Sequence, residues 1–163
     1  MGGKPIGVLT SLSLPEGFST RELNELYDGI RTFCAPLRIS LLGGNITESD
    51  CGLHIVTSVI GTARSPIFRS KAKLGDLIAV TGALGGAMAG LYLLSGKVNA
   101  NFTELKKDLL SVRHRRPRSR IEAGEMLGKF KISAMIDISD GLISDIMHIA
   151  EESRVGFSIE LDK

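Results

Sequence analysis

The feature that most constrains the fold is a switch in the spacing of apolar residues along the N-terminal part of the chain. Residues 5–14 alternate apolar and polar side chains, which is typical of a β-strand. Residues 20–36 then repeat apolar side chains at helical spacing, and Ser19 with Glu22 predicts a capping box at the start of that helix. A short strand, RISLL, and a longer strand over residues 52–62 follow. This order predicts an α+β unit over residues 1–62.

A second unit is predicted over residues 63–163, so the expected fold class is α+β with two domains. Apolar segments read as strands alternate there with amphipathic helices. The predicted strands are residues 76–80, 132–138 and 156–161. The predicted helices are residues 84–96, 103–113, 118–129 and 141–153, with Pro117 near the first turn of the third.

Composition favours an ordinary globular protein of the cytoplasm. Of the 163 residues, 43% are hydrophobic, and the formal net charge of +2 is too small to favour nucleic acid or an anionic membrane as the main partner. The N-terminus lacks the pattern of a secretion signal. The most apolar window, residues 77–94, contains four glycines and is better explained by a strand, a turn and a helix than by a membrane span. Cys34 and Cys51 form no CxxC pair, which indicates reduced thiols.

An acidic turn is the strongest candidate site. The predicted strand 132–138 delivers Asp137 near its end, and Ser139 and Asp140 lie in the turn before the next helix. Two carboxylates three residues apart are well placed to bind Mg²⁺, which prefers oxygen ligands. Alternatively, Asp140 or Ser139 only caps the helix. Capping does not account for Asp137, an acid inside an apolar run.

Two glycine-rich segments are weaker candidates. In LLGGNIT, residues 41–47, the glycine pair Gly43-Gly44 after a strand lets backbone N–H groups approach an anion, and Asn45 offers an amide to a metal or a phosphate. The same residues also fit an ordinary turn between two antiparallel strands. In VTGALGG the glycine spacing differs from the dinucleotide-binding pattern GxGxxG, so close packing of a strand on a helix explains it more simply. The chain has no P-loop motif.

No catalytic group can be assigned from the other polar residues of the chain. The basic run RHRRPRSR, residues 113–120, has no interleaved aromatic residues, so solvation or neutralisation of phosphate explains it better than nucleic-acid binding. The three histidines lack the spacing of a zinc site. No Ser-His-Asp or Cys-His arrangement can be identified.

Taken together, the motifs resemble a known family. GGNIT, FRSKAKLGDLIAVTGALG, RRPRSRIEAG and AMIDISDGLISDIMHIAEES follow one another as in thiamine-monophosphate kinases, within the superfamily of aminoimidazole ribonucleotide synthetase and selenophosphate synthetase. The resemblance covers essentially the whole chain, and DISDGL is its most specific part. It implies a two-domain fold like that of aminoimidazole ribonucleotide synthetase, present only in part.

The resemblance also implies an activity and a set of site residues. Family members transfer the γ-phosphoryl group of ATP to thiamine monophosphate, use several Mg²⁺ ions and form homodimers. By matching motifs, the implied metal ligands are Asn45, Asp137 and Asp140, and the implied ATP contacts are Gly44, Asn45, Arg69 and Ser139. Asn45 stands where the family usually has an aspartate, which implies a weakened or remodelled metal site.

The resemblance further implies that the chain is the middle of such a kinase. Residues 1–62 match the second half of the N-terminal, ATP-binding and dimerising domain, and residues 63–163 match the first half of the C-terminal α/β domain. The opening MGG resembles the end of a family segment whose metal-binding aspartate lies further upstream. We therefore expect little or no turnover from this polypeptide alone. The alternatives are another ATP-using member of the superfamily, such as a selenophosphate synthetase or the hydrogenase-maturation dehydratase, a non-catalytic dimerisation remnant and, more distantly, a nucleic-acid binder.

Overall fold

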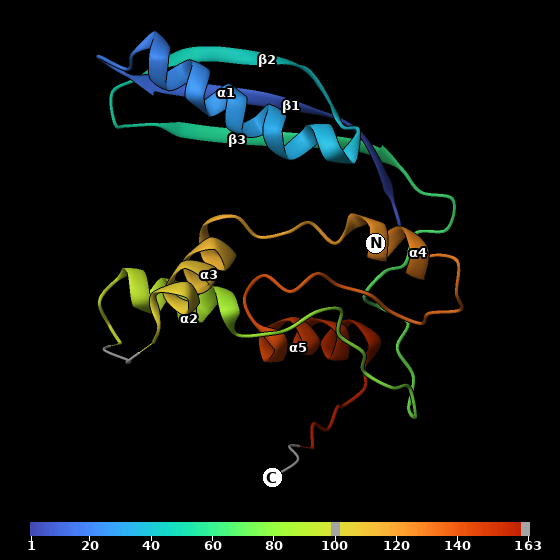
Figure 1. Ribbon diagram of the computed structural model, residues 1–163. Coiled ribbons are helices and arrows are strands. Elements are labelled where there is room, and N and C mark those ends of the chain that lie inside the picture. Colours follow the sequence, from blue (N-terminus) through green and yellow to red (C-terminus); the bar gives the residue numbers. More distant parts are fainter. Residues whose placement is uncertain (99–101, 161–163) are drawn as a thin grey trace. The chain divides into compact units, whose positions relative to one another are not determined.

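The computed structural model describes residues 1–98 and 102–160 of the chain, which divides into two compact units (Figure 1). We call Gly3–Arg64 the sheet unit. We call Met1–Gly2 together with Ser65–Lys163 the helical unit. Each unit is described by itself below.

The sheet unit is a three-stranded sheet with one long helix. Its strands are β1 (Lys4–Pro15), β2 (Ser40–Ser49) and β3 (His54–Thr62), in the order β2-β1-β3. β1 pairs with β2 in parallel and with β3 antiparallel. Parallel neighbours need a crossover connection, and helix α1 (Thr20–Cys34) with the short 3₁₀ helix η1 (Ala35–Leu37) supplies it. Figure 1 shows α1 running along one face of the sheet.

The core of the sheet unit lies on β1, the central strand. Val8, Thr10 and Leu12 are buried, and Cys34 at the end of α1 is buried as well. The alternation of these β1 residues confirms the strand predicted over residues 5–14. The hydroxyl group of Thr10 has no hydrogen-bond partner among the described residues.

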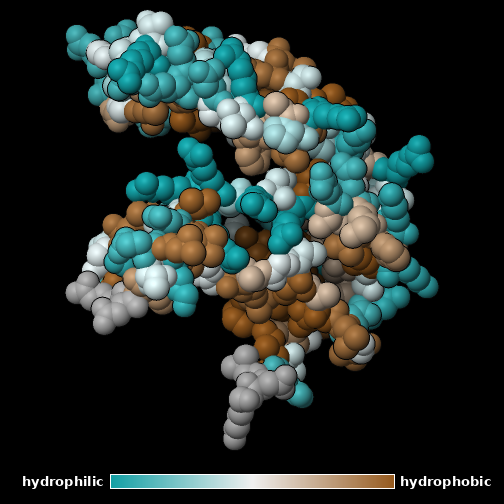
Figure 2. Space-filling model, viewed as in Figure 1, coloured by the Kyte–Doolittle hydropathy of each residue, from teal (hydrophilic) through white to brown (hydrophobic). Residues whose placement is uncertain are grey.

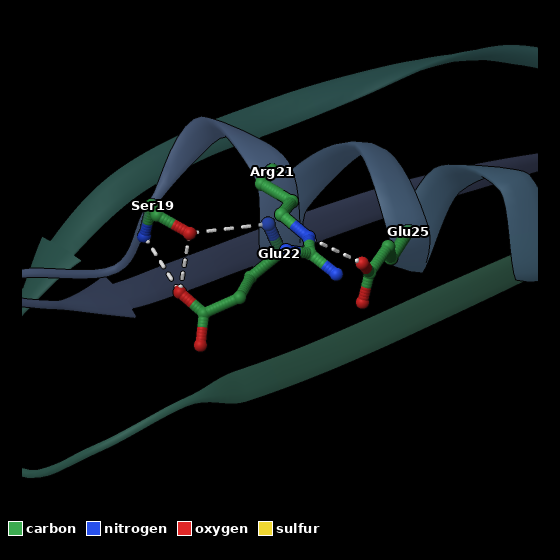
Figure 3. A network of polar contacts seen from close by, with 4 residues as sticks. All are labelled: Ser19, Arg21, Glu22 and Glu25. Carbon is green, nitrogen blue, oxygen red and sulfur yellow. Dashed lines mark hydrogen bonds and ion pairs between the residues drawn. The ribbon is translucent and has the colours of Figure 1, made fainter.

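Helix α1 begins with the predicted capping box (Figure 3). The Glu22 backbone N–H donates to Ser19 Oγ at 3.2 Å, and the Ser19 backbone N–H donates to Glu22 Oε2 at 2.8 Å. The Ser19 hydroxyl also donates to the same carboxylate oxygen at 2.7 Å. Backbone N–H groups at the start of a helix have no acceptor in a preceding turn, and these bonds provide acceptors for them.

The Gly-Gly-Asn segment is neither a loop after a strand nor a turn, the two interpretations of its sequence, because β2 continues through these residues. Gly44 pairs with Thr10 and Asn45 with Ser11 in the parallel ladder. Upstream, a register shift leaves Leu42 as an extra residue, which makes a β-bulge. A side chain at Gly44 would collide with the Thr10 carbonyl group, so the glycine lets β2 approach β1 closely.

The helical unit contains four α-helices among its described residues. They are α2 (Gly86–Leu94), α3 (Glu104–Arg115), α4 (Ile121–Leu127) and α5 (Leu142–Ser153). All four lie within or close to the predicted ranges. α2 packs on α3, and Gly90 is buried where a side chain would collide with the Leu110 carbonyl group. Pro117 is not in the first turn of α4, since that helix begins only at Ile121.

The strands predicted in this unit are not present among its described residues. Residues 76–80, 132–138 and 156–160 form no strand ladder, and Leu161 lies outside the described residues. A β-strand needs a neighbouring strand with which to form hydrogen bonds, and the spacing of apolar residues does not show whether such a neighbour is present. Met135 does donate its N–H to the Phe68 carbonyl oxygen at 3.1 Å.

The apolar side chains of these segments are therefore left exposed. Leu77 is 96% exposed and Ile138 41% exposed. Figure 2 shows hydrophobic residues on the visible surface of the molecule. No helix found in residues 1–98 and 102–160 has the length and hydropathy that a membrane crossing requires.

Candidate metal and nucleotide site

The acidic turn lies at the start of α5 in the helical unit. An extended apolar segment leads to Asp137, residues 139–141 form the turn, and α5 begins at Leu142. Gly141 occupies the N-cap position with a φ of 120°, a backbone conformation that suits glycine. The helix predicted over residues 141–153 is thus confirmed within one residue.

The backbone of this turn is held by an aspartate from inside the helix. Asp145 Oδ2 accepts the N–H of Ser139 at 3.0 Å, of Asp140 at 3.2 Å and of Gly141 at 3.2 Å. Asp145 is only 3% exposed. Successive N–H groups in such an arrangement form an anion-binding concavity, and here the protein's own carboxylate fills it.

Asp140 does not cap α5, which rules out the simpler interpretation of the turn. The N-cap residue is Gly141, and no side-chain cap hydrogen bond is present at this helix. Asp137 and Asp140 are both exposed, and neither carboxylate has a hydrogen bond or an ion pair with another described residue. Both carboxylates therefore remain available to an external cation.

The donor set of the turn fits a hard divalent cation. Asp137 and Asp140 offer carboxylate oxygens, and Ser139, also exposed, offers a hydroxyl group. Mg²⁺ in nucleotide sites is commonly held by one or two carboxylates, phosphate oxygens and several waters. Within residues 1–98 and 102–160, no group of three or more His, Cys, Asp or Glu side chains is placed to hold a metal ion. The turn therefore suits Mg²⁺ with a phosphate ligand better than a closed, all-protein site.

The backbone around Arg69 is fixed by the other end of the same helix. Ser153, the last residue of α5, donates its hydroxyl to the Arg69 carbonyl oxygen at 2.7 Å and accepts the Ala72 N–H at 3.0 Å. Arg69 is exposed and forms no ion pair with another described residue. Helix α5 thus organises the acidic turn at its first residues and the Arg69 segment at its last.

A second aspartate orders the segment that follows Arg69. Asp76 Oδ2 accepts the Lys73 N–H at 2.9 Å. This bond, followed by a hydrogen bond with the Ser133 side chain, lowers the pKa of Asp76. A carboxylate that accepts hydrogen bonds is favoured in its charged form. The Asp76 N–H also donates to the Lys73 carbonyl oxygen at 3.1 Å, so Asp76 closes the turn at residues 73–76.

In the second glycine-rich segment, VTGALGG, two glycines leave room for arginine side chains. A side chain at Gly82 would collide with the Arg120 guanidinium group, and one at Gly86 would come within 2.6 Å of Arg113 Cδ. Close packing was predicted here, but the neighbours are arginines rather than a strand. A depression of about 340 Å³ at the end of α3 includes none of the predicted site residues; it is lined by Asp108, Ser111, Val112, Arg115 and Arg116.

Gly44 and Asn45 belong to the sheet unit, on the edge strand β2. Both are exposed. The remaining predicted residues, Arg69, Asp137, Ser139 and Asp140, belong to the helical unit.

Sequence reasoning missed Asp145 and Ser153. Asp145 had a recognisable signal, because it is an acid on the apolar side of a predicted helix and lies four residues after Gly141. At that spacing its side chain can reach back to the turn. Ser153 had no such signal, since its partners lie more than 80 residues away in the chain.

Comparisons with known proteins agree with the order of motifs. The N-terminal domain of AIR synthase related proteins matches residues 1–63, and the C-terminal domain of the same family matches residues 73–163. The thiamine-monophosphate kinase of Bacillus subtilis is 34% identical over 98% of this chain and 50% of its own length. That of Aquifex aeolicus is 34% identical over 99% of this chain and 52% of its own length.

Solved structures give the same result. AaThiL complexed with AMPPCP and TMP superimposes with a TM-score of 0.85 at 34% identity, over 94% of this chain and 48% of that one. The hydrogenase maturation protein HypE in complex with ATP shares the fold, with a TM-score of 0.59 at 20% identity. The chain spans about half the length of the thiamine-monophosphate kinases it matches. Since the two matched domains cover nearly all of its length, the chain belongs to the family of AIR synthase related proteins.

Proposed function

We propose that this chain is part of a thiamine-monophosphate kinase, which transfers the γ-phosphoryl group of ATP to thiamine monophosphate and yields thiamine diphosphate. One observation carries the proposal. Asp137 and Asp140 present unpaired, exposed carboxylates, and the backbone at Asp140 and its two neighbours in the turn is held by a buried side chain. The kinases that this chain resembles over its whole length support the choice of substrates.

We propose Asp137 and Asp140 as ligands of Mg²⁺, and Ser139 as a contact to ATP. When bound, Mg²⁺ would neutralise negative charge on the phosphates of ATP. The anion-binding concavity of this turn is already filled by Asp145, so its backbone N–H groups are not free to bind a phosphate. The turn therefore contributes carboxylates that bind cations rather than N–H groups that bind anions.

We propose roles for three further residues, Arg69 in the helical unit and Gly44 and Asn45 in the sheet unit. Arg69 would contact ATP, because a guanidinium group forms strong charge-assisted hydrogen bonds with phosphate oxygens. Gly44 and Asn45 would contact ATP from β2, and Asn45 would also be a neutral metal ligand. Phosphoryl transfer depends mostly on positioning and on neutralisation of charge, which these residue types supply.

The wider assignments follow the same resemblance. Residues 1–62 would form the second half of an ATP-binding and dimerising domain, and residues 63–163 the first half of a C-terminal α/β domain. The kinase would be a cytoplasmic homodimer with no nucleic-acid or membrane partner.

Calorimetry with AMPPCP in the presence and absence of MgCl₂ tests the proposal. We expect Mg²⁺-dependent binding to the wild-type chain, and affinity weaker by about tenfold or more in Asp137→Ala, because a charged ligand is lost. Asp108→Ala is the matched control, since Asp108 is an exposed aspartate on α3 outside the proposed site. Equal affinities in wild type and Asp137→Ala would contradict the proposed role of the turn.

A second candidate is a non-catalytic dimerisation module. Asn45 in place of an acid favours it, as does the lack of a three-ligand cluster within the described part of the chain. This candidate predicts no Mg²⁺-dependent binding of AMPPCP to the wild type.

Another ATP-using member of the superfamily would bind the nucleotide but phosphorylate a different acceptor, which a screen of phosphate acceptors would reveal.

A further inference from the structure

Asp145 is a buried acid that the proposed phosphoryl transfer does not use directly. It lies in the first turn of α5, is 3% exposed, and directs one carboxylate oxygen at three backbone N–H groups of the acidic turn. A buried charge is costly unless it is paired or hydrogen-bonded, so these donors account for its presence among apolar residues. Because the side chain is buried, an incoming cation would meet Asp137 and Asp140 first.

The choice of partners separates Asp145 from an ordinary capping residue. A first-turn carboxylate that only stabilises the start of a helix accepts the N–H of the N-cap residue, as Glu22 does at Ser19. Asp145 accepts that bond from Gly141 and also accepts the N–H groups of Ser139 and Asp140, which precede the N-cap. Its bonds therefore restrain the turn that carries the candidate ligands.

We infer that Asp145 is a positioning residue, which fixes the backbone of Ser139–Gly141 so that the Asp140 carboxylate and the Ser139 hydroxyl are presented in one orientation. The inference rests on the proposed function in one respect, namely that the turn binds Mg²⁺ and a nucleotide. Groups that orient metal ligands commonly change metal affinity by about 10–100-fold when they are replaced. A ligand held in place before binding also loses less conformational freedom when the metal arrives.

The inference predicts a graded response in two variants. Asp145→Asn keeps an acceptor oxygen of similar shape but loses the charge, so its hydrogen bonds to the turn weaken. Asp145→Ala removes the acceptor altogether. We expect the affinity for Mg²⁺ with AMPPCP to fall about 10-fold in Asp145→Asn and up to about 100-fold in Asp145→Ala. Glu152→Gln is the matched control, because it removes an exposed carboxylate from the same helix.

A second measurement tests the positioning without any nucleotide. Amide hydrogen exchange at Ser139, Asp140 and Gly141 reports on the three bonds directly. We expect slow exchange in the wild type, faster exchange in Asp145→Asn and unchanged exchange in Glu152→Gln. Circular dichroism should show that α5 remains folded in Asp145→Asn, which separates loss of orientation from loss of structure.

The outcomes distinguish this inference from the proposed function. If the wild type does not bind AMPPCP with Mg²⁺, the proposed function fails, while the exchange data still decide whether Asp145 holds the turn. If the wild type binds and Asp145→Asn binds within about twofold of it, the positioning role is overturned. Rapid exchange at all three amides of the wild type would also overturn it.

Discussion

At the scale of single residues, the acidic turn shows how similar side chains acquire different roles from their surroundings. Asp137 and Asp140 are exposed and unpaired in the described part of the chain, whereas Asp145 is buried and accepts three backbone N–H groups at one carboxylate oxygen. The sequence places all three in one short segment. Asp137 and Asp140 can bind a cation because they are exposed, whereas the buried Asp145 restrains the backbone of the turn.

Asn45 gives a prediction at this scale. In Asn45→Asp, the affinity for Mg²⁺ with AMPPCP should rise about tenfold, because a charged oxygen ligand replaces a neutral one. Calorimetry measures this directly. Asn24→Asp is the matched control, since it adds the same charge to an exposed position on α1 in the same unit. An equal gain in both variants would show that general electrostatics, rather than a ligand at Asn45, is responsible.

Gly44 shows why the role of a single residue was harder to predict from the sequence than a helix or a strand. The Gly-Gly-Asn segment fitted either an anion-binding loop or a turn, and the structure contains a continuous strand instead. Contact with the Thr10 carbonyl group is enough to require glycine there. Its proposed contact with ATP therefore depends on the family resemblance, and not on the glycine itself.

At the scale of elements, helices were predicted well and strands unevenly. The capping box at Ser19 and Glu22 and the spacing of α5 are local signals, and the structure confirms both helices. β1 was also predicted, because one of its faces is buried. The segments 76–80 and 132–138 are apolar like β1, but no neighbouring strand pairs with them among the described residues. The sequence of one segment does not show whether a pairing strand exists.

The capping box of α1 predicts a pH dependence. The Ser19 hydroxyl, and then the Ser19 backbone N–H, donates to Glu22 and lowers its pKa. A group whose pKa is lowered by folding stabilises the folded state above its ordinary pKa, and that contribution is lost as the pH falls through the lowered pKa. The wild type should therefore lose more thermal stability than Glu22→Gln between about pH 6 and about pH 3.

Thermal denaturation followed by circular dichroism measures this difference. Glu16→Gln is the control, because it removes the charge of an exposed acid just before the helix and leaves the Ser19–Glu22 hydrogen bonds in place. Parallel profiles for wild type and Glu22→Gln would mean that the capping box does not contribute through the charge of Glu22.

At the scale of the whole molecule, each of the two units holds residues with a proposed role, and the chain spans about half the length of the kinases it matches. The described residues present two unpaired carboxylates on one turn, and no cluster of three metal-binding side chains. The resemblance implies several Mg²⁺ ions, and since each Mg²⁺ is usually held by one or two carboxylates, these two would serve only part of such a set.

We therefore expect this polypeptide to bind AMPPCP in a Mg²⁺-dependent way while showing no thiamine diphosphate formation above background. Binding needs only part of the ligand set, whereas turnover also needs the acceptor phosphate in position, and misplacement by about 1 Å costs about 100-fold in rate. Incubation with ATP, MgCl₂ and thiamine monophosphate, followed by chromatography, measures turnover. The Bacillus subtilis thiamine-monophosphate kinase assayed in parallel is the positive control. Robust turnover by this chain would mean that the acidic turn, Arg69 and β2 suffice for catalysis, and that the longer relatives use their additional length for something other than the chemical step.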